Sequence, residues 1–292
     1  MNFLKRKYYQ LLTSFLKRYS SNDLAYIKAN YYLKNNRKLH IGNPKEFTEK
    51  LQWLRLHVYN ETYKDFVDKY EVRKYISEKI GDRYLNDLIG VYDSTDAIKF
   101  EELPNQFALK CTHGSGYNVI VKDKPTINVK EIKNKLNTYM SKNYYDKYKE
   151  LIYKDIRPRI IAERYLYQTD SENIIDYKFY CISGSPKYVL VKTFHNHKYC
   201  NCFYDLDWNK LKNDVNYSAY LEEPIEKPKN FDELLNIAKK LSEDFIFIRV
   251  DLYSINGIVY FGELTFFPRA GFKRLTVERL NKELGDMIKL PI

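Results

Sequence analysis

The spacing of apolar residues indicates helices in some segments of the chain and strands in others. The segment 2–19 has apolar residues at helical spacing, namely Leu4, Tyr8, Leu11, Phe15 and Leu16. Much of the rest of its surface is basic, through Lys5, Arg6, Lys7, Lys17 and Arg18. Two interpretations stay open: an amphipathic helix on an anionic membrane, or a helix that packs on the protein with its basic side in solvent.

The remaining pattern predicts a mixture of helices and strands. We expect helices over 46–58, 61–80, 129–150 and 231–242. We expect strands over 106–111, 118–122, 159–166, 176–182, 187–194, 246–253 and 259–265, a strand and loop over 83–100, and a loop over 204–229. Because strands and helices do not alternate strictly, the pattern favours an α+β fold over a doubly wound sheet.

Composition describes a globular, basic chain. Its 292 residues are 44% hydrophobic, which excludes a disordered protein. No stretch approaches the roughly 20 apolar residues that cross a bilayer, so we expect a cytoplasmic protein. The net charge of +11 indicates an anionic partner. No nucleic-acid-binding motif accompanies this charge, so we expect no nucleic acid among the partners.

The cysteines give no evidence of a disulfide framework. There are four of them in a chain of this length. His195, His197, Cys200 and Cys202 are close together, but they lack the separated pairs of a zinc site. A polar loop that runs into a strand is the simpler interpretation.

One candidate phosphate site lies at 107–123, FALKCTHGSGYNVIVKD. An expected strand carries Lys110, and the loop after it contains Gly114, Ser115 and Gly116. Small residues let backbone N–H groups approach phosphate oxygens, and the lysine adds positive charge. The segment matches neither the P-loop nor the Rossmann motif, and taken alone a plain hairpin remains the alternative.

A candidate metal site lies at 247–268, FIRVDLYSINGIVYFGELTFFP, where Asn256-Gly257 signals a hairpin. A two-residue turn would pair Ile255 with Ile258, and so Asp251 with Gly262. A three-residue loop with a bulge would instead place Asp251 opposite Glu263. In that register Arg249, Asp251, Glu263 and Thr265 share one face, and facing carboxylates with open positions suit Mg²⁺. A solvent-facing acidic pair is the alternative.

These motifs, taken in order, resemble the ATP-grasp superfamily over about 65–268. More closely, the run NPKEFTEKLQWLRL … FVDKYEVRKYISEKIG … FALKCTHGSGYNVI … IIAERYL … DYKFYC … FIRVDLYSINGIVYFGELTF resembles the TupA-like ATP-grasp proteins of bacterial surface-polysaccharide clusters, over about 40–291. The resemblance implies an ATP-grasp fold with two α+β subdomains that clasp ATP, preceded by N-terminal helices. The implied boundaries are 1–64 for the helical region, 65–160 for the subdomain with the phosphate loop and 161–292 for the subdomain with the metal hairpin.

The resemblance also implies roles for individual residues. Lys69 (after Asp68) and Lys110 would contact ATP phosphates, and the loop His113, Gly114, Ser115 and Gly116 would close over them. Ala162 and Tyr165 would offer backbone groups to adenine beside Glu163, Asp176 would bind ribose, and Lys178 would reach phosphate. Asp251 and Glu263 would bind Mg²⁺, and Arg249 would act catalytically with Lys110. The usual E-x-N metal motif is Glu263-Leu264-Thr265 here, so the third ligand is Thr265, a water or another carboxylate.

The implied activity is that of an ATP- and Mg²⁺-dependent carboxylate–amine ligase that forms an acyl phosphate. Its implied partners are ATP, an anionic capsular or cell-wall glycan or glycan precursor, and an amine donor. In many relatives a full domain that helps bind substrate precedes the ATP-binding half, and we expect none in this sequence. Two alternatives stay open: a phosphotransferase with a hydroxyl acceptor, and a non-catalytic module that binds membrane or anionic glycan. Residues 2–19 would allow peripheral contact with the inner face of the membrane.

Overall fold

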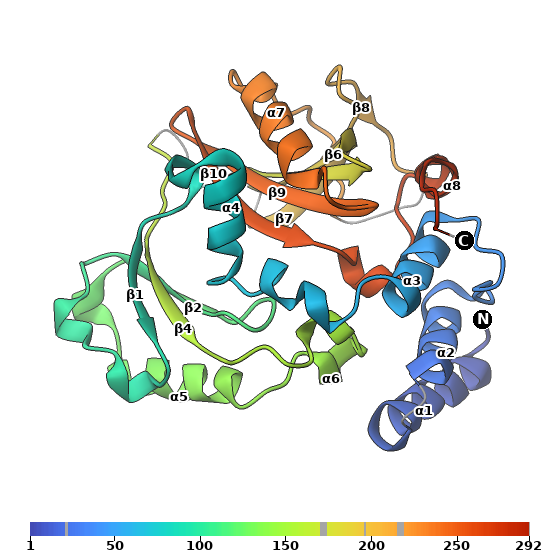
Figure 1. The fold of residues 1–292 in the computed structure, drawn as a ribbon, viewed down its shortest axis with the longest axis horizontal. Coiled ribbons are helices and arrows are strands. Elements are labelled where there is room, and N and C mark those ends of the chain that lie inside the picture. Colours follow the sequence, from blue (N-terminus) through green and yellow to red (C-terminus); the bar gives the residue numbers. More distant parts are fainter. Residues whose placement is uncertain (21–22, 170–173, 196, 215–218, 292) are drawn as a thin grey trace.

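Two antiparallel sheets form the centre of the molecule (Figure 1). The structure is a computed structural model and describes residues 1–20, 23–169, 174–195, 197–214 and 219–291. The smaller sheet has the order β1-β4-β2-β3, with β1 Leu88–Tyr92, β2 Phe107–Cys111, β3 Asn118–Val121 and β4 Ile160–Arg164. The larger has the order β10-β9-β5-β6-β7-β8, with β5 Asp176–Ile182, β6 Ser185–His195, β7 Lys198–Tyr204, β8 Lys210–Leu211, β9 Phe247–Ile255 and β10 Ile258–Thr265.

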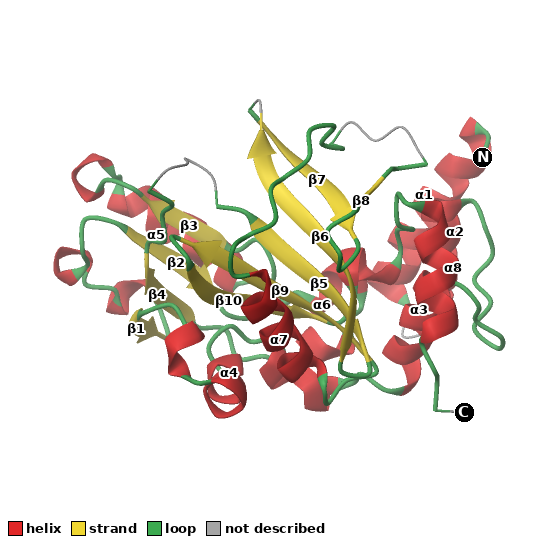
Figure 2. Ribbon diagram, turned by 90° about the horizontal axis from the view of Figure 1, so that it is seen from above, coloured by secondary structure: helices red, strands yellow, loops and turns green. Residues whose placement is uncertain are grey.

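Helices surround these sheets, and the expected α+β class is confirmed. They are α1 Phe3–Tyr19, α2 Asp23–Asn35, α3 Phe47–His57, α4 Val72–Ile80, α5 Val129–Met140, α6 Tyr145–Tyr148, α7 Phe231–Ser242 and α8 Glu278–Met287. In both views α1, α2, α3 and α8 gather at one end, and α5 lies with the smaller sheet at the other (Figures 1 and 2). Helix α7 packs on the larger sheet and α4 packs on α7. Each sheet has its own buried apolar cluster.

The helix expected over 61–80 is divided into two parts. A 3₁₀ helix covers Glu61–Phe66, and α4 begins only at Val72. The Asp68 carboxylate accepts hydrogen bonds from the backbone N–H groups of Tyr70, at 2.7 Å, and Glu71, at 3.1 Å. Asp68 thus makes a local turn between the 3₁₀ helix and α4, and this turn separates the two parts.

Two other expected elements also differ. The helix expected over 129–150 ends at Met140, because the Asn143 side chain accepts from the N–H of Tyr145 at 3.0 Å and donates to the carbonyl of Lys154 at 2.9 Å, which makes a turn. The loop expected over 204–229 contains the short strand β8, and its residues 215–218 lie outside the described part of the chain. Cys200 and Cys202 are buried in β7. His195 lies at the end of β6, and residue 196, between His195 and His197, lies outside the described part of the chain.

Helix α1 packs against the protein, but the face that packs is not the apolar face that the sequence pattern indicates. Tyr9 stacks on Tyr32 of α2 with ring centroids 4.4 Å apart, and Thr13 is buried. The apolar stripe of Leu4, Tyr8, Leu11 and Phe15 is instead exposed, each side chain by 59% or more. The interpretation in which this stripe packs against the protein is therefore wrong. In the part of the chain that the structure describes, every helix is too short or too polar to cross a membrane.

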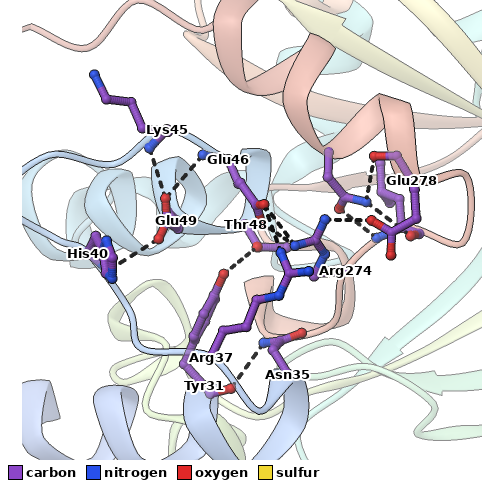
Figure 3. Close-up of polar contacts among 12 residues, drawn as sticks. Tyr31, Asn35, Arg37, His40, Lys45, Glu46, Thr48, Glu49, Arg274 and Glu278 are labelled. Carbon is purple, nitrogen blue, oxygen red and sulfur yellow. Dashed lines mark hydrogen bonds and ion pairs between the residues drawn. The ribbon is translucent and has the colours of Figure 1, made fainter.

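A polar network fastens α2 and α3 to the C-terminal segment (Figure 3). Arg274 donates to both oxygens of Glu46, at 2.8 and 2.7 Å, and to Glu278 at 2.6 Å. The hydroxyls of Tyr31 and Thr48 lie 2.9 Å apart, which joins α2 to α3. The N-terminal helices are thus held against the segment that follows β10, far away in the sequence.

Candidate nucleotide and metal site

The hairpin of β9 and β10 places the two expected metal carboxylates opposite each other. Asn256 and Gly257 have positive φ values of 51° and 80°, as a two-residue turn requires, and Ile255 pairs with Ile258. A bulge at Gly262 then shifts the register, so that Glu263 pairs with Asp251. The expected pairing is confirmed, but the three-residue loop is wrong, because the extra residue lies in the strand and not in the turn.

Gly262 is required by the close approach of the two strands. A Cβ atom there would lie 2.9 Å from the Asp251 carbonyl oxygen and 3.0 Å from the Tyr253 ring. Any larger residue would push the strands apart at the bulge that sets the position of Glu263.

Arg249 binds the polar groups on one face of the hairpin. It donates to Asp251 from Nε, at 2.6 Å, and from Nη2, at 2.7 Å. The same Nη2 reaches Glu263 at 3.1 Å and the Thr265 hydroxyl at 3.0 Å. The Thr265 hydroxyl also donates to Glu263 at 3.0 Å. The four residues expected on one face are therefore in contact.

The two carboxylates differ in environment. The side chain of Glu263 is 43% exposed, whereas that of Asp251 is 1% exposed. Burial raises the pKa of Asp251 to about 6, against the opposing effect of Arg249 and Lys178. For Glu263, burial acts in the same direction but is outweighed by Arg249, Lys178 and Lys69, which bring its pKa to about 2. Glu263 is thus a charged carboxylate at the surface of the cleft, and Asp251 lies beneath it.

Lys178 on β5 joins the expected ribose residue to the metal hairpin. Its ammonium forms an ion pair with Asp176 at 2.5 Å and contacts the Asp251 carboxylate. Burial disfavours its charge, but Asp251 and Asp176 outweigh that effect, and the pKa of Lys178 is raised. Asp251, Lys178 and Asp176 therefore form a chain of alternating charges between the metal hairpin and the outer part of the cleft.

Lys69 lies at the Gly-containing loop between β2 and β3. Its N–H donates to the carbonyl of Thr112 at 3.2 Å, and its ammonium contacts the carbonyl of Gly114. Burial and the neighbouring Lys110 lower its pKa, and Glu263 opposes this. An anion bound there would relieve the repulsion between the lysines.

Lys110 and Glu163 form the second charged pair of the cleft. The Lys110 ammonium lies 2.6 Å from the Glu163 carboxylate, which also faces Arg73 at 3.5 Å. Residues distant in sequence line one cleft between the two sheets, among them Lys69, Lys110, Gly114, Ser115, Glu163 and Glu263. Tyr165 and Asp176 line its outer part together with Lys110.

The loop between β2 and β3 is anchored at one end and exposed at its tip. His113 is 2% exposed, and its Nε2 lies 3.2 Å from the Tyr139 carbonyl. The ring of Tyr117 stacks on that of Tyr139 with centroids 4.9 Å apart. Only Ser115 and Gly116 are open to solvent within this turn, so these two residues are the part of the loop free to approach a phosphate.

The connection after β4 crosses from the smaller sheet to the larger one. Ala162 lies in the middle of β4, paired with Gly90 and Leu109, and is buried, so its backbone serves the sheet and cannot bind adenine as expected. Tyr165 follows the end of the strand. Further along, Gln168 accepts from the N–H of Asn256 at the tip of the hairpin, at 3.2 Å.

The groups present fit a magnesium nucleotide. Asp176 Oδ1 is buried without a hydrogen-bond partner among the described residues, so it can accept from a ribose hydroxyl. Glu263 and Thr265 supply oxygen donors of the kind that Mg²⁺ prefers. The oxygens of Asp251 already face Arg249 and Lys178, so Asp251 would join a metal only if one of these cations moved. Across the described ranges there is no cluster of three or more His, Cys, Asp or Glu residues that could hold a metal, so further ligands would come from water or phosphate.

Several residues of the cleft could not be singled out in the sequence. Tyr153 and Tyr253 line it, and Arg159 pairs with Asp68 at 3.2 Å beside Lys69. Their positions depend on contacts between distant segments, and no local motif marks them.

Comparison with known proteins places the chain in a family. The profile of the TupA-like ATPgrasp family matches residues 49–289. No curated protein matches the chain. Among solved structures, D-alanine–D-alanine ligase from Bacillus anthracis complexed with ATP is 18% identical with a TM-score of 0.45, over 76% of this chain and 64% of that one. The chain thus spans less than two thirds of that ligase.

Two further solved structures are similar. N5-carboxyaminoimidazole synthase from Aspergillus clavatus is 11% identical with a TM-score of 0.43, over 84% of this chain and 58% of that one. A RimK domain ATP-grasp protein from Sphaerobacter thermophilus is 11% identical with a TM-score of 0.42, over 77% of this chain and 67% of that one.

Proposed function

The chain belongs to the TupA-like ATP-grasp family, and from this premise we propose that it is an ATP- and Mg²⁺-dependent carboxylate–amine ligase. The observation that carries the proposal is the cleft between the sheets. There Lys69, Lys110 and Glu263, which come from three distant segments, face one another, and Arg249 and Asp251 lie directly behind Glu263.

The proposed chemistry has two steps. An oxygen of the substrate carboxylate attacks the γ-phosphorus of ATP, the bond to ADP breaks, and an acyl phosphate forms. An amine then attacks the acyl carbon, a C–N bond forms, and phosphate leaves. Lys69 and Lys110 would orient the phosphates, and Arg249 would stabilise the negative charge that develops on the transferred group. Magnesium, held by Glu263 with Asp251 and Thr265, would add charge neutralisation when bound.

The substrate class rests on the resemblance to the TupA-like proteins of bacterial surface-polysaccharide clusters. We propose that the carboxylate or the amine belongs to a bacterial capsular or cell-wall polysaccharide or its precursor, and that the chain acts in the cytoplasm. The net charge of +11 is consistent with such an anionic partner.

We also propose that α1 attaches the enzyme to an anionic membrane surface. Its apolar stripe is exposed, and the helix also carries Lys5, Arg6, Lys7, Lys17 and Arg18, of which Lys5 lies over the Tyr32 ring of α2. Such a helix would bring the cleft to lipid-linked precursors.

The assay that tests the activity is ATP consumption with pooled uronic acids and amino acids as substrates. ADP together with an amide product supports the ligase. ADP together with a phosphoester product would show that the chain is a phosphotransferase and not a ligase. If wild type forms no more ADP than a Glu263→Gln variant, the remaining interpretation is the non-catalytic binding module.

A further inference from the structure

A second cavity lies on the other side of Glu263 from the two phosphate lysines. Ser115, Tyr153 and Glu263 line both this cavity and the nucleotide cleft, so they form the partition between the two. Arg249 and Thr265 also face the second cavity. A molecule bound there would therefore meet the reacting end of a nucleotide bound in the cleft.

One buried side chain, Arg55, joins two of the segments that line this cavity. Arg55 on α3 is 2% exposed and donates to the carbonyl of Ala270 at 3.3 Å and to that of Tyr148. Gln52 donates to the same Ala270 carbonyl at 3.0 Å. Tyr145 on α6 donates to Asp23 on α2 at 2.7 Å (Figure 1 shows these two helices). The N-terminal helices thus hold in place the segments that line the cavity, and α2 contributes Lys34 to its lining.

The turn after β10 has unusual backbone geometry at this cavity. Arg269 and Ala270 both have a φ of 54°, a left-handed conformation that costs energy for residues other than glycine. Backbone strain of this kind persists where the surrounding structure enforces it, and it is concentrated at binding sites. Here Gln52 and Arg55 hold the turn through the Ala270 carbonyl.

The charges that line the cavity are of two kinds. Four exposed cations stand on its rim, namely Lys34, Lys147, Arg269 and Lys273. In its wall lies Glu150, which is 5% exposed. Among the described residues no cation lies within ion-pair distance of the Glu150 carboxylate, and its oxygens make no hydrogen bond there. A carboxylate in such a wall has no protein cation directly at its oxygens, although Arg55 and Lys147 lie close enough to favour its charge. A ligand that enters the cavity with a cation or a donor would compensate its desolvation.

We propose that this second cavity is the amine-substrate site, in which Glu150 binds the ammonium group of a primary amine and the rim cations bind an acidic group on the same molecule. This deepens the proposed function and rests on it. An amino acid or an amino sugar phosphate has this combination of charges.

The placement of Glu150 also accounts for the protons of the second step. The ammonium gives one proton to the Glu150 carboxylate, and the neutral amine attacks the acyl carbon. As the C–O bond to phosphate breaks, the remaining extra proton on nitrogen leaves with the phosphate. Burial raises the pKa of Glu150 to about 7, against the opposing effect of Arg55 and Lys147, which suits a proton acceptor at neutral pH.

The test measures amine binding to the Mg²⁺-loaded protein with a non-hydrolysable ATP analogue. The panel contains the common L-amino acids, D-alanine and glucosamine 6-phosphate, and affinity is measured by calorimetry. Wild type should bind at least one of them, and Glu150→Gln should weaken that affinity about ten-fold or more, as expected for a lost charged hydrogen bond. Glu101→Gln, a change at an exposed glutamate outside the cavity, should leave it unchanged.

A second variant covers the case in which Glu150→Gln does not fold. Lys147→Gln, on the exposed rim, should weaken binding of the same amine several-fold while the ATP analogue binds as in wild type. Unchanged amine affinity in whichever variants fold, or no binding by any member of the panel to wild type, would overturn the proposal. Failure of wild type to bind the ATP analogue would instead overturn the proposed function, and this inference with it.

Discussion

At the scale of single residues, the site is built from charges that already have partners. Arg249 and Lys178 surround Asp251, whereas Glu263 keeps part of its side chain open to the cleft. Since Glu263 also has the lower pKa of the two carboxylates, it is the group best placed to meet a metal ion at neutral pH.

This assignment predicts the effect of Glu263→Gln. Turnover should fall by about 10²–10³-fold, the range found when one preorganised electrostatic contact is lost. The fold should remain, because the side chain is 43% exposed. ADP formation and circular dichroism would be compared with those of Glu101→Gln. Near-normal turnover would show that Glu263 does not bind the metal.

A second prediction concerns Lys110. Lys110→Ala should weaken ATP binding by about 1–3 kcal/mol, as for a lost hydrogen bond between charged groups. The change also leaves Glu163 with only Arg73 nearby, which adds negative charge to the cleft. The exposed Lys130→Ala on α5 is the matched control. If calorimetry gives wild-type affinity for both Lys110→Ala and Lys69→Ala, the phosphates bind elsewhere.

A third prediction uses the pKa of Glu150. That pKa is about 7 in the folded protein, above the ordinary value, so the folded state binds more protons than the unfolded state between the two values. The free energy of unfolding of wild type should therefore fall as the pH rises through this range. Glutamine does not ionise, so the stability of Glu150→Gln should not fall in this way. The variant should be more stable than wild type at pH 8, by up to about 3 kcal/mol, and about as stable as wild type at pH 4.5.

The groups around Glu150 do not disturb this test. They are Arg55, Lys147, Tyr26, Tyr144, Tyr148 and Tyr153. Burial raises the pKa of Tyr26, Tyr144 and Tyr153 further above the range, and arginine stays charged throughout it. Denaturant unfolding at several pH values, without ligand, gives the measurement. Parallel curves for wild type and Glu150→Gln would mean that Glu150 does not titrate near neutrality.

At the scale of elements, the bulge at Gly262 determines the geometry of the hairpin. Gly262→Val should destabilise the fold by about 1–3 kcal/mol, the usual cost of overpacking. It should also reduce Mg²⁺-dependent ATP turnover, because Glu263 would move relative to Asp251. Gly42→Ala is the control, since a Cβ there has no atom within 4 Å. A Gly262→Val variant with wild-type stability and turnover would show that the strand spacing has no such role.

The same hairpin illustrates what the sequence could predict. The alternation of apolar and polar residues, with Asn256-Gly257 at the turn, predicts the hairpin and the shared face, but it leaves Asp251 opposite either Gly262 or Glu263. The sequence alone places the extra residue in the turn, because local pattern contains no signal for the close contact of Gly262 with the Asp251 backbone. In the same way, the pattern over 61–80 is helical throughout, and the structure shows that the Asp68 carboxylate instead makes a turn with the N–H groups of Tyr70 and Glu71.

Contacts between distant segments lay beyond prediction. Lys178 meets Asp251 because β5 pairs with β9, and the two residues are 73 positions apart in the chain. Glu150 lies in a segment expected to be helical, and nothing in its neighbours indicates burial against Arg55. Charge networks and cavity walls of this kind depend on the packing of whole elements.

At the scale of the whole molecule, the N-terminal helices have two different relations to the rest of the protein. Helices α2 and α3 are tied to the C-terminal segment through Arg274 and Glu46, and Arg55 of α3 supports the turn at Ala270 that lines the second cavity. Helix α1 contacts α2 through Tyr9 and Tyr32, and its apolar stripe faces solvent. Removal of α1 should therefore be tolerated, whereas removal of α2 and α3 should not.

The last prediction follows from this difference. Full-length protein should sediment with anionic vesicles at low salt, and a variant lacking residues 2–19 should not. Each basic residue of α1 that comes near the lipid surface could contribute about 1 kcal/mol before screening, so attachment should weaken as salt is added. Leu11, which is 65% exposed, would insert its side chain among the lipids. Leu11→Ser should therefore reduce sedimentation without changing the fold, and Thr138→Ser on α5 serves as the matched control. The truncated protein should still bind ATP, because α1 contributes no residue to the nucleotide cleft. If full-length protein never sediments, or if the truncation unfolds, α1 is a structural helix and the membrane proposal is wrong.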